Sequence, residues 1–142
     1  MSPARRPFVV LFACVHNAGR SQMAAAFLNH LADPAKARAM SAGTQPAEHV
    51  HPVVAAVMRE VGIDLSNAQP QRLTPELAAQ ADLLITMGCS EECPAIPGLR
   101  RDDWPLPDPK GQPIERVREI RGEIRARVEQ LLSQGEDKGL GA

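Results

Sequence analysis

Near the start of the chain, five residues separate a cysteine from an arginine, in the run Cys14-Val15-His16-Asn17-Ala18-Gly19-Arg20-Ser21. The apolar run Phe8–Ala13 before it predicts a buried strand, and the residues from Arg20 onward predict a helix. Backbone N–H groups in such a tight turn can surround a tetrahedral oxyanion. We expect the helix N-terminus and Arg20 to favour the thiolate of Cys14, placing a nucleophile beneath a bound anion. Ser21 can hydrogen-bond that thiolate or cap the helix.

Composition and charge limit the classes of function that the chain can have. Its 142 residues predict a single domain, 1–142, with a disordered tail from about Gly135 to Ala142. The net charge of −1 argues against non-specific nucleic-acid binding, so that anion recognition must be local. The apolar run after the basic N-terminus is too short to span a membrane and lacks a signal-peptide pattern. We therefore expect a cytoplasmic protein with no membrane or nucleic-acid partner.

The pattern of apolar residues and turn residues predicts strands that alternate with helices. The expected strands are Phe8–Ala13, Ala37–Ala42 and Asp82–Met87. The expected helices are Arg20–Leu31, His51–Val61, a short one opened by Thr74-Pro75, and Ile114–Leu132, whereas the proline-rich stretch Pro94–Pro113 is expected to be irregular.

Such alternation implies a parallel sheet covered on both faces, which binds ligands beyond the carboxyl ends of its strands. Cys14, Gly43 and Cys89 all follow expected strand ends. We therefore expect their loops to converge on one site.

Two further cysteines, Cys89 and Cys93, follow the third expected strand. On a helical turn this spacing places the alpha carbons about 6 Å apart, within reach of a disulfide. Three thiols near one pocket suggest a relay of thiol–disulfide exchange. Two alternatives remain, a pair of inert packed cysteines and a zinc site that would draw on His49 and His51.

Asp108 is a candidate proton donor, because prolines hold the chain on both sides of it in Leu106-Pro107-Asp108-Pro109. A carboxylic acid near a bound anion could protonate a departing oxygen. Asp102 and Asp103 lie nearby in sequence, and a simple surface turn is the alternative. His16 lies within the loop, but we expect its ring to point outward and assign it no side-chain chemistry.

Together these motifs resemble the arsenate reductases built on the low-molecular-weight protein tyrosine phosphatase fold. The motifs that carry the resemblance are Cys14-x5-Arg20-Ser21, Ser41-Ala42-Gly43-Thr44, Ile85-Thr86-Met87-Gly88-Cys89 followed by Cys93-Pro94, and Asp108-Pro109. The resemblance covers Phe8 to about Leu132 and implies a four-stranded parallel sheet with helices on both faces.

The resemblance also implies a mechanism and a set of partners. Cys14 attacks arsenate held by loop amides and Arg20, and Asp108 protonates the departing oxygen. Cys89 then forms a disulfide with Cys14, and Cys93 moves the disulfide to Cys89–Cys93. The thiols are then restored by thioredoxin, which receives its electrons from NADPH through thioredoxin reductase, or by another thiol reductant. The resemblance implies no bound cofactor and no metal. Phosphate or sulfate would mimic the substrate, and we expect a monomer that serves arsenic detoxification.

The chain departs from the family pattern at two points. The relay cysteines lie closer together than in well-known thioredoxin-coupled members, which leaves the reductant open. Some members also carry a glutamate on the first helix that helps to bind a monovalent cation, whereas Ala25 stands at the matching position here. We therefore expect no such cation site, although Asn17 and Ser41 remain to brace the loop.

Two other functions compete with arsenate reduction. A phosphotyrosine phosphatase would use the same loop, but its pocket usually has aromatic walls, and this chain has no tyrosine and only 3% aromatic residues. A non-catalytic oxyanion sensor could use the three thiols, but no partner-binding feature is apparent in the sequence.

Overall fold

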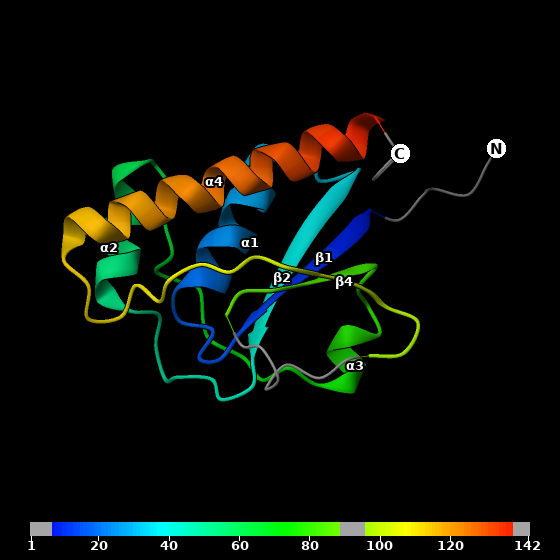
Figure 1. Ribbon diagram of the computed structural model, residues 1–142, viewed down its shortest axis with the longest axis horizontal. Helices are drawn as coiled ribbons and strands as arrows, with labels where there is room; N and C mark the ends of the chain where they lie inside the picture. The colour runs from blue at the N-terminus through cyan, green and yellow to red at the C-terminus, as the bar shows by residue number, and fades with distance from the viewer. Residues whose placement is uncertain (1–6, 89–95, 138–142) are drawn as a thin grey trace.

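The computed structural model describes residues 7–88 and 96–137, in which four strands form one parallel sheet (Figure 1). The strands lie in the order β2-β1-β3-β4, and every neighbouring pair is parallel. In chain order the elements are β1 (Phe8–Cys14), α1 (Arg20–Leu31), β2 (Ala37–Gly43), α2 (Pro52–Glu60), α3 (Pro75–Ala78), β3 (Leu83–Thr86), β4 (Arg100–Asp103) and α4 (Ile114–Asp137).

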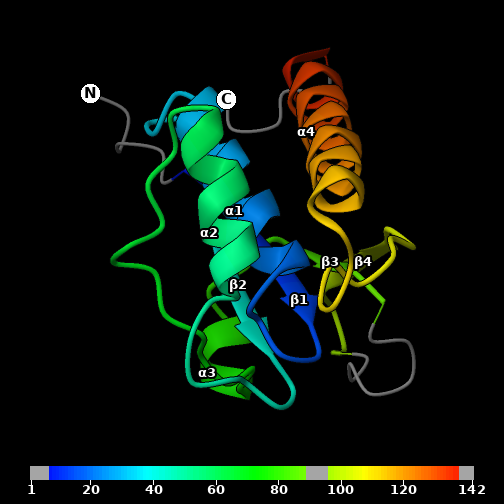
Figure 2. The ribbon, with the colours of Figure 1, turned by 90° about the vertical axis from the view of Figure 1, so that its left-hand side faces the viewer.

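Helices cover both faces of the sheet (Figure 2). On β1, Val10, Phe12 and Cys14 face the larger core, to which α1, α2 and α4 contribute. The alternate residues Leu11 and Ala13 face a smaller core that α3 closes. Because β1 is buried on both faces, its sequence is apolar without alternation. The expected four-stranded parallel sheet with helices on both faces is confirmed.

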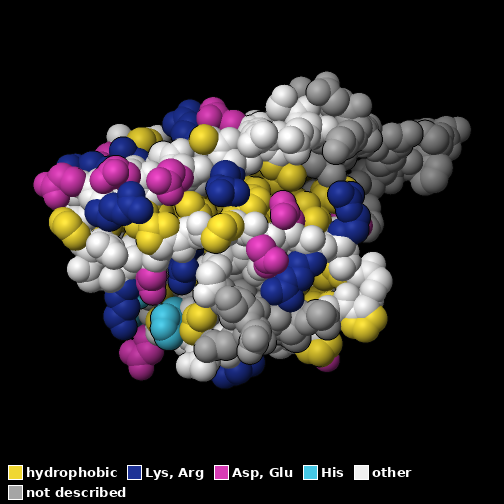
Figure 3. Space-filling model, viewed as in Figure 1, with side chains coloured by type: hydrophobic (Ala, Val, Ile, Leu, Met, Phe, Trp, Pro, Cys, Tyr) yellow, Lys and Arg dark blue, Asp and Glu magenta, His cyan; other side chains and the backbone are white. Residues whose placement is uncertain are grey.

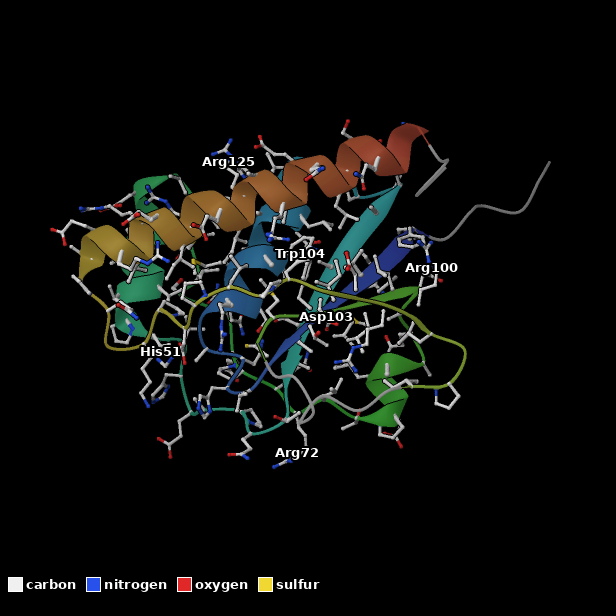
Figure 4. All side chains as sticks on the ribbon, in the orientation of Figure 1. His51, Arg72, Arg100, Asp103, Trp104 and Arg125 are labelled. Atoms are coloured by element: carbon white, nitrogen blue, oxygen red, sulfur yellow. The ribbon has the colours of Figure 1, made fainter. Side chains whose placement is uncertain are left out.

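The stretch expected to be irregular contains the fourth strand, β4, so this prediction was wrong for Arg100–Asp103. All four residues are exposed, since β4 is an edge strand that pairs only with β3. A charged edge strand has neither an apolar run nor an apolar alternation, and therefore no sequence signal. Directly after it, Trp104 lies between β4 and α4 and packs 5.5 Å from the Phe12 ring (Figure 4).

The last helix is longer than expected. It runs to Asp137, whereas the sequence predicted an end near Leu132 and a disordered tail from Gly135. The prediction was therefore wrong for residues 135–137, while residues 138–142 lie outside the described part. Leu131 and Leu132 pack against the larger core, and extending a formed helix by one more turn costs little.

The outer surface of α4 carries acidic and basic side chains side by side (Figure 3). Two of its arginines, Arg118 and Arg121, pair with Glu60 at the end of α2, each at 2.7 Å. These ion pairs link α2 to α4. No helix in the described residues has the length and apolar character needed to cross a membrane.

Candidate active site

The loop between β1 and α1 turns its carbonyl groups toward the chain that follows β2. Four hydrogen bonds hold it there, in which backbone N–H groups of that following chain donate to carbonyl groups of Cys14 and the loop. The pairs are Thr44 to Cys14 at 3.3 Å, Gln45 to Val15 at 2.8 Å, Ala47 to His16 at 2.9 Å, and His51 to Ala18 at 2.9 Å. Because the carbonyls are engaged on the outside, the loop amides are left available on the other side.

Those amides are available for a ligand. Across residues 7–88 and 96–137, the backbone N–H groups of Val15 through Arg20 donate to no protein acceptor. The N-cap of α1 is Gly19, which has no side chain to cap the helix, and the first helical turn carries no acidic residue. Open N–H groups at a helix N-terminus are a favourable place for an oxyanion.

Gly43, at the end of β2, allows the loop to pack closely on the strand. A methyl group built at this position would lie 2.5 Å from the Val15 carbonyl oxygen and 2.9 Å from the backbone nitrogen of Asn17. Only glycine leaves room for this approach of two backbones. The motif residue Gly43 therefore shapes the loop rather than contacting an anion.

Ser21 connects the Cys14 thiol to Asn17. Cys14 is buried, and its Sγ lies 2.8 Å from the Ser21 Oγ. The Asn17 Oδ1 accepts the N–H of Gln71 at 2.9 Å, which fixes the orientation of the Asn17 amide. The Asn17 Nδ2 therefore donates to the Ser21 Oγ at 2.7 Å. This leaves the Ser21 hydrogen free to point at Sγ, where it stabilises a thiolate.

Asn17 has an unusual backbone conformation. Its φ is 49°, and among the described residues it is the only non-glycine with a positive φ. Asparagine tolerates this left-handed region better than most residues. The side chain is fully buried, so that its hydrogen bonds hold a strained loop in place.

Arg20 reaches from the first turn of α1 toward the chain after β4. Its Nη1 donates to the Leu106 carbonyl oxygen at 2.9 Å, and its Nη2 lies 3.8 Å from the Asp108 Oδ2. The guanidinium also packs on Gly88, where a built methyl group would collide with Nη1. The structure therefore places Arg20 between the end of the β3 segment and Asp108.

The Asp108-Pro109 segment packs over the loop. A methyl group built at Gly19 would lie 2.8 Å from the Pro109 Cγ, so that the proline lies directly on the loop backbone. The Asp108 Oδ1 accepts the N–H of Lys110 at 3.0 Å, and its side chain is 45% exposed. A carboxyl group in this position is open to solvent and next to the arginine.

Four residues around the loop have contacts that the sequence did not predict. Gln22 and Gln71 bind Asn17, and Leu106 binds Arg20. His51 lies at the start of α2 (Figure 4), beside Gly19. The pKa of His51 lies below its ordinary value, mainly because its side chain is partly buried. Asp108 acts in the opposite direction and raises this pKa, whereas Lys110 and His16 also lower it. The sequence indicated His51 only as the start of a helix, marked by the following Pro52, and as a possible zinc ligand.

His16 lies as expected on the outer side of the loop. Its ring Nδ1 is 3.0 Å from the Gln45 carbonyl oxygen. Within the described residues, no group of three or more histidine, cysteine or acidic side chains is arranged to hold a metal ion.

Cys89 and Cys93 lie outside the described residues, so their relay stays a prediction. The chain leading to them is described. Met87 donates its N–H to the Ala13 carbonyl oxygen at 2.8 Å, directly before Cys14. The strand β3 therefore ends beside the loop between β1 and α1, residues 14–20, called the anion loop below.

Comparison with known proteins gives a consistent result. The family model described as low molecular weight phosphotyrosine protein phosphatase matches residues 9–139. A protein of Halobacterium salinarum named "putative arsenate reductase" is 41% identical over 87% of this chain and 89% of its own length. The glutaredoxin arsenate reductase of Synechocystis sp. is 36% identical over 88% of this chain and 96% of its own length.

A solved structure is also similar. A thioredoxin-dependent arsenate reductase of Corynebacterium glutamicum superposes with a TM-score of 0.82 and 39% identity. The match covers 96% of this chain but 65% of that longer chain.

Proposed function

We propose that this chain, which belongs to the low molecular weight phosphotyrosine protein phosphatase family, reduces arsenate to arsenite with electrons from thiols. The observation that carries the proposal is the buried thiol of Cys14 beside a loop of open N–H groups. The similarity of this chain to several proteins named arsenate reductases supports arsenate as the oxyanion.

In the first step the Cys14 thiolate attacks the arsenic atom of arsenate. A sulfur–arsenic bond forms and an arsenic–oxygen bond breaks. Asp108 supplies the proton that lets the oxygen leave as water. The loop N–H groups and Arg20 hold the remaining oxygens, with Arg20 still having N–H groups that Leu106 does not use.

In the second step the Cys89 thiolate attacks the Cys14 sulfur. A disulfide forms while the sulfur–arsenic bond breaks, and its electron pair stays on arsenic, which leaves as arsenite. Two sulfur atoms are oxidised and arsenic gains two electrons, so that the step balances. Cys93 then attacks Cys89, which frees Cys14 and moves the disulfide to Cys89–Cys93.

An external thiol reductant closes the cycle. We propose thioredoxin, itself reduced by NADPH through thioredoxin reductase, because the relay ends in a protein disulfide. The similar proteins differ in this respect, since one is named for glutaredoxin and another for thioredoxin. No bound cofactor and no metal takes part in the proposed chemistry.

The test is an NADPH-coupled assay of arsenate reduction with three parallel reductants: thioredoxin, glutaredoxin with glutathione, and a mycothiol-type system. We expect arsenate-dependent NADPH oxidation, fastest with thioredoxin and competitively inhibited by phosphate or sulfate. If no reductant supports turnover while a phosphotyrosine substrate is hydrolysed, the chain is the alternative phosphatase. The absence of tyrosine and the exposed Lys110 beside Asp108 favour a small oxyanion over an aryl phosphate.

The proposed role is arsenic detoxification by a cytoplasmic monomer in which residues 1–142 act as one domain. Expression in an arsenate-sensitive strain should restore growth on arsenate. Size-exclusion chromatography with light scattering should give the mass of one chain, 15.3 kDa.

A further inference from the structure

The imidazole ring of His51 lies against the anion loop. Its carbon Cδ2 is 3.5 Å from the position that a methyl group on Gly19 would occupy, and Nε2 is bonded to that carbon. The backbone holds the residue in this place, because the His51 N–H donates to the Ala18 carbonyl oxygen at 2.9 Å. The start of α2 (Figure 4) is therefore attached to the loop and brings the ring to the N-terminus of α1.

The ring nitrogens of His51 are left available for a ligand. Among the residues that the structure describes, neither nitrogen has a hydrogen-bond partner. His51 is the N-cap residue of α2, but its side chain makes no capping hydrogen bond. The side chain is only partly exposed. An imidazole in this position can still donate a hydrogen bond to a molecule bound in the loop.

The groups around the ring carry charges of both signs. Asp108 favours the protonated imidazole, whereas Lys110 and His16 disfavour it. Asp108 also lies 3.8 Å from the guanidinium of Arg20, which takes up part of its charge. Burial has the largest effect, so that the pKa of His51 lies below its ordinary value. With the site empty at neutral pH, the imidazole is therefore neutral.

An oxyanion in the loop would change this balance. A negative charge beside an imidazole favours its charged form and raises its pKa. By thermodynamic linkage, the anion and the proton then strengthen each other's binding by the same factor. The site thus gains a positive charge in addition to Arg20, and it gains this charge when an anion is present to pair with it.

We propose that His51 is an oxyanion-binding residue of this site, and that its imidazole takes a proton from solvent when a doubly charged oxyanion enters the loop. The imidazolium then donates a hydrogen bond to the anion from Nε2. The inference rests on residues 14–20 being the oxyanion site of the proposed function. It goes further, because it adds a binding residue and makes the affinity for an oxyanion depend on pH.

The test is calorimetric titration of the reduced full chain with sulfate between about pH 5 and pH 8, the range in which histidine changes its charge. Sulfate stays doubly charged throughout, whereas phosphate changes its own charge. Repeating the titration in buffers of different ionisation enthalpy gives the number of protons taken up with each sulfate. The measurement needs neither arsenate nor turnover, so a failure of the proposed function and a failure of this inference are distinguishable.

Two substitutions remove the titratable ring. His51→Asn keeps a favourable N-cap residue for α2, and His51→Gln is a second neutral variant. Neither amide can take up a proton and supply the additional positive charge. The matched control is His49→Asn, because His49 is exposed in the same segment. Cys14, His16 and Asp108 are unchanged in every variant, so their own responses to pH cancel in the comparison.

For the unmodified chain we expect the sulfate affinity to rise as the pH falls, with proton uptake on binding. At about pH 5, both His51 variants should bind sulfate about tenfold more weakly, as expected for a lost charge-assisted hydrogen bond. The difference should narrow toward about pH 8, and both variants should take up fewer protons. His49→Asn should match the unmodified chain throughout.

Two results would overturn the inference. One is a His51 variant that is folded by circular dichroism and binds sulfate as tightly as the unmodified chain at about pH 5. The other is an unmodified chain that binds no sulfate at any pH in this range.

Discussion

The guanidinium of Arg20 lies against the backbone of Gly88, in the space that any other residue would fill with its side chain. Gly88 has a φ of +87°, so that both its conformation and its surroundings call for glycine. This contact, together with the Leu106 carbonyl, determines where the arginine of the anion loop is held.

Replacing Gly88 with alanine should therefore displace Arg20 and weaken oxyanion binding by about tenfold or more, as expected for a lost charge-assisted hydrogen bond. Phosphate binding, measured as competitive inhibition or by calorimetry, checks this. The matched control is Gly62→Ala, at a φ of +82° with nothing within 4 Å of the added methyl group. Both variants should lose ~1–2 kcal/mol in free energy of unfolding, but only Gly88→Ala should lose phosphate affinity. Equal phosphate binding by both would refute the role given to Gly88.

Removing the hydroxyl of Ser21 should make Cys14 less reactive. In Ser21→Ala the thiolate loses its hydrogen-bond donor, and we expect alkylation of Cys14 near neutral pH to slow by about tenfold. Ser66→Ala, an exposed serine in a turn, serves as the control. An unchanged alkylation rate in Ser21→Ala would show that Ser21 does not act on the thiol.

Substitutions of the three cysteines should stop the reaction at different steps. Cys14→Ser should abolish arsenate turnover, because no sulfur–arsenic bond can form. Cys89→Ser should allow at most one adduct per chain and no disulfide, and Cys93→Ser should stop before the final disulfide. Rapid-quench measurement of arsenite, with mass spectrometry of the disulfides, separates these outcomes. Full multiple turnover by both Cys89→Ser and Cys93→Ser would rule out the relay.

Asp108→Asn should slow formation of the adduct by about a hundredfold, since an amide cannot protonate the departing oxygen. Phosphate binding should be nearly unchanged, because Asp108 is half-exposed and forms no part of the loop. Single-turnover kinetics measure the step directly. Asp102→Asn, on the exposed strand β4, is the control and should retain the normal rate. An undiminished single-turnover rate in Asp108→Asn would remove this residue from the mechanism.

The ion pairs of Glu60 should make stability depend on pH in the acid range. Hydrogen bonds from Arg118 and Arg121 lower the pKa of Glu60 from 4.5 to about 2. A carboxyl group whose pKa is lowered by folding stabilises the folded state fully at pH values above its ordinary pKa. This contribution is lost as the pH falls toward about 2. In urea unfolding, Glu60→Gln should therefore have a lower free energy of unfolding than the unmodified chain at neutral pH, but the same value at a pH near 2. Glu76→Gln, which is exposed on α3, should show no difference at either pH. A gap for Glu60→Gln that persists at low pH would contradict this assignment.

Much of the architecture could be predicted, because the spacing of apolar residues along a segment indicates which of its side chains are buried. The helix α1 begins and ends where the sequence predicts, at Arg20 and Leu31, and β1 was predicted to within one residue. The resemblance to the family is confirmed as well, since its motifs are short runs of neighbouring residues. The edge strand β4 was missed because its exposed charges look the same in a strand as in a loop.

The candidate site divides in the same way. From the amino-acid sequence alone it follows that Cys14 lies at the end of a buried strand, just before a helix N-terminus that carries an arginine. The folded structure was needed to show that Gly88 supports Arg20, that His51 and Pro109 flank Gly19, and that Gln22 joins Asn17 to Gln69. The physical reason is that periodicity and propensity act between near neighbours in the chain. Contacts between distant segments depend on how the packed sheet brings its loops to one edge.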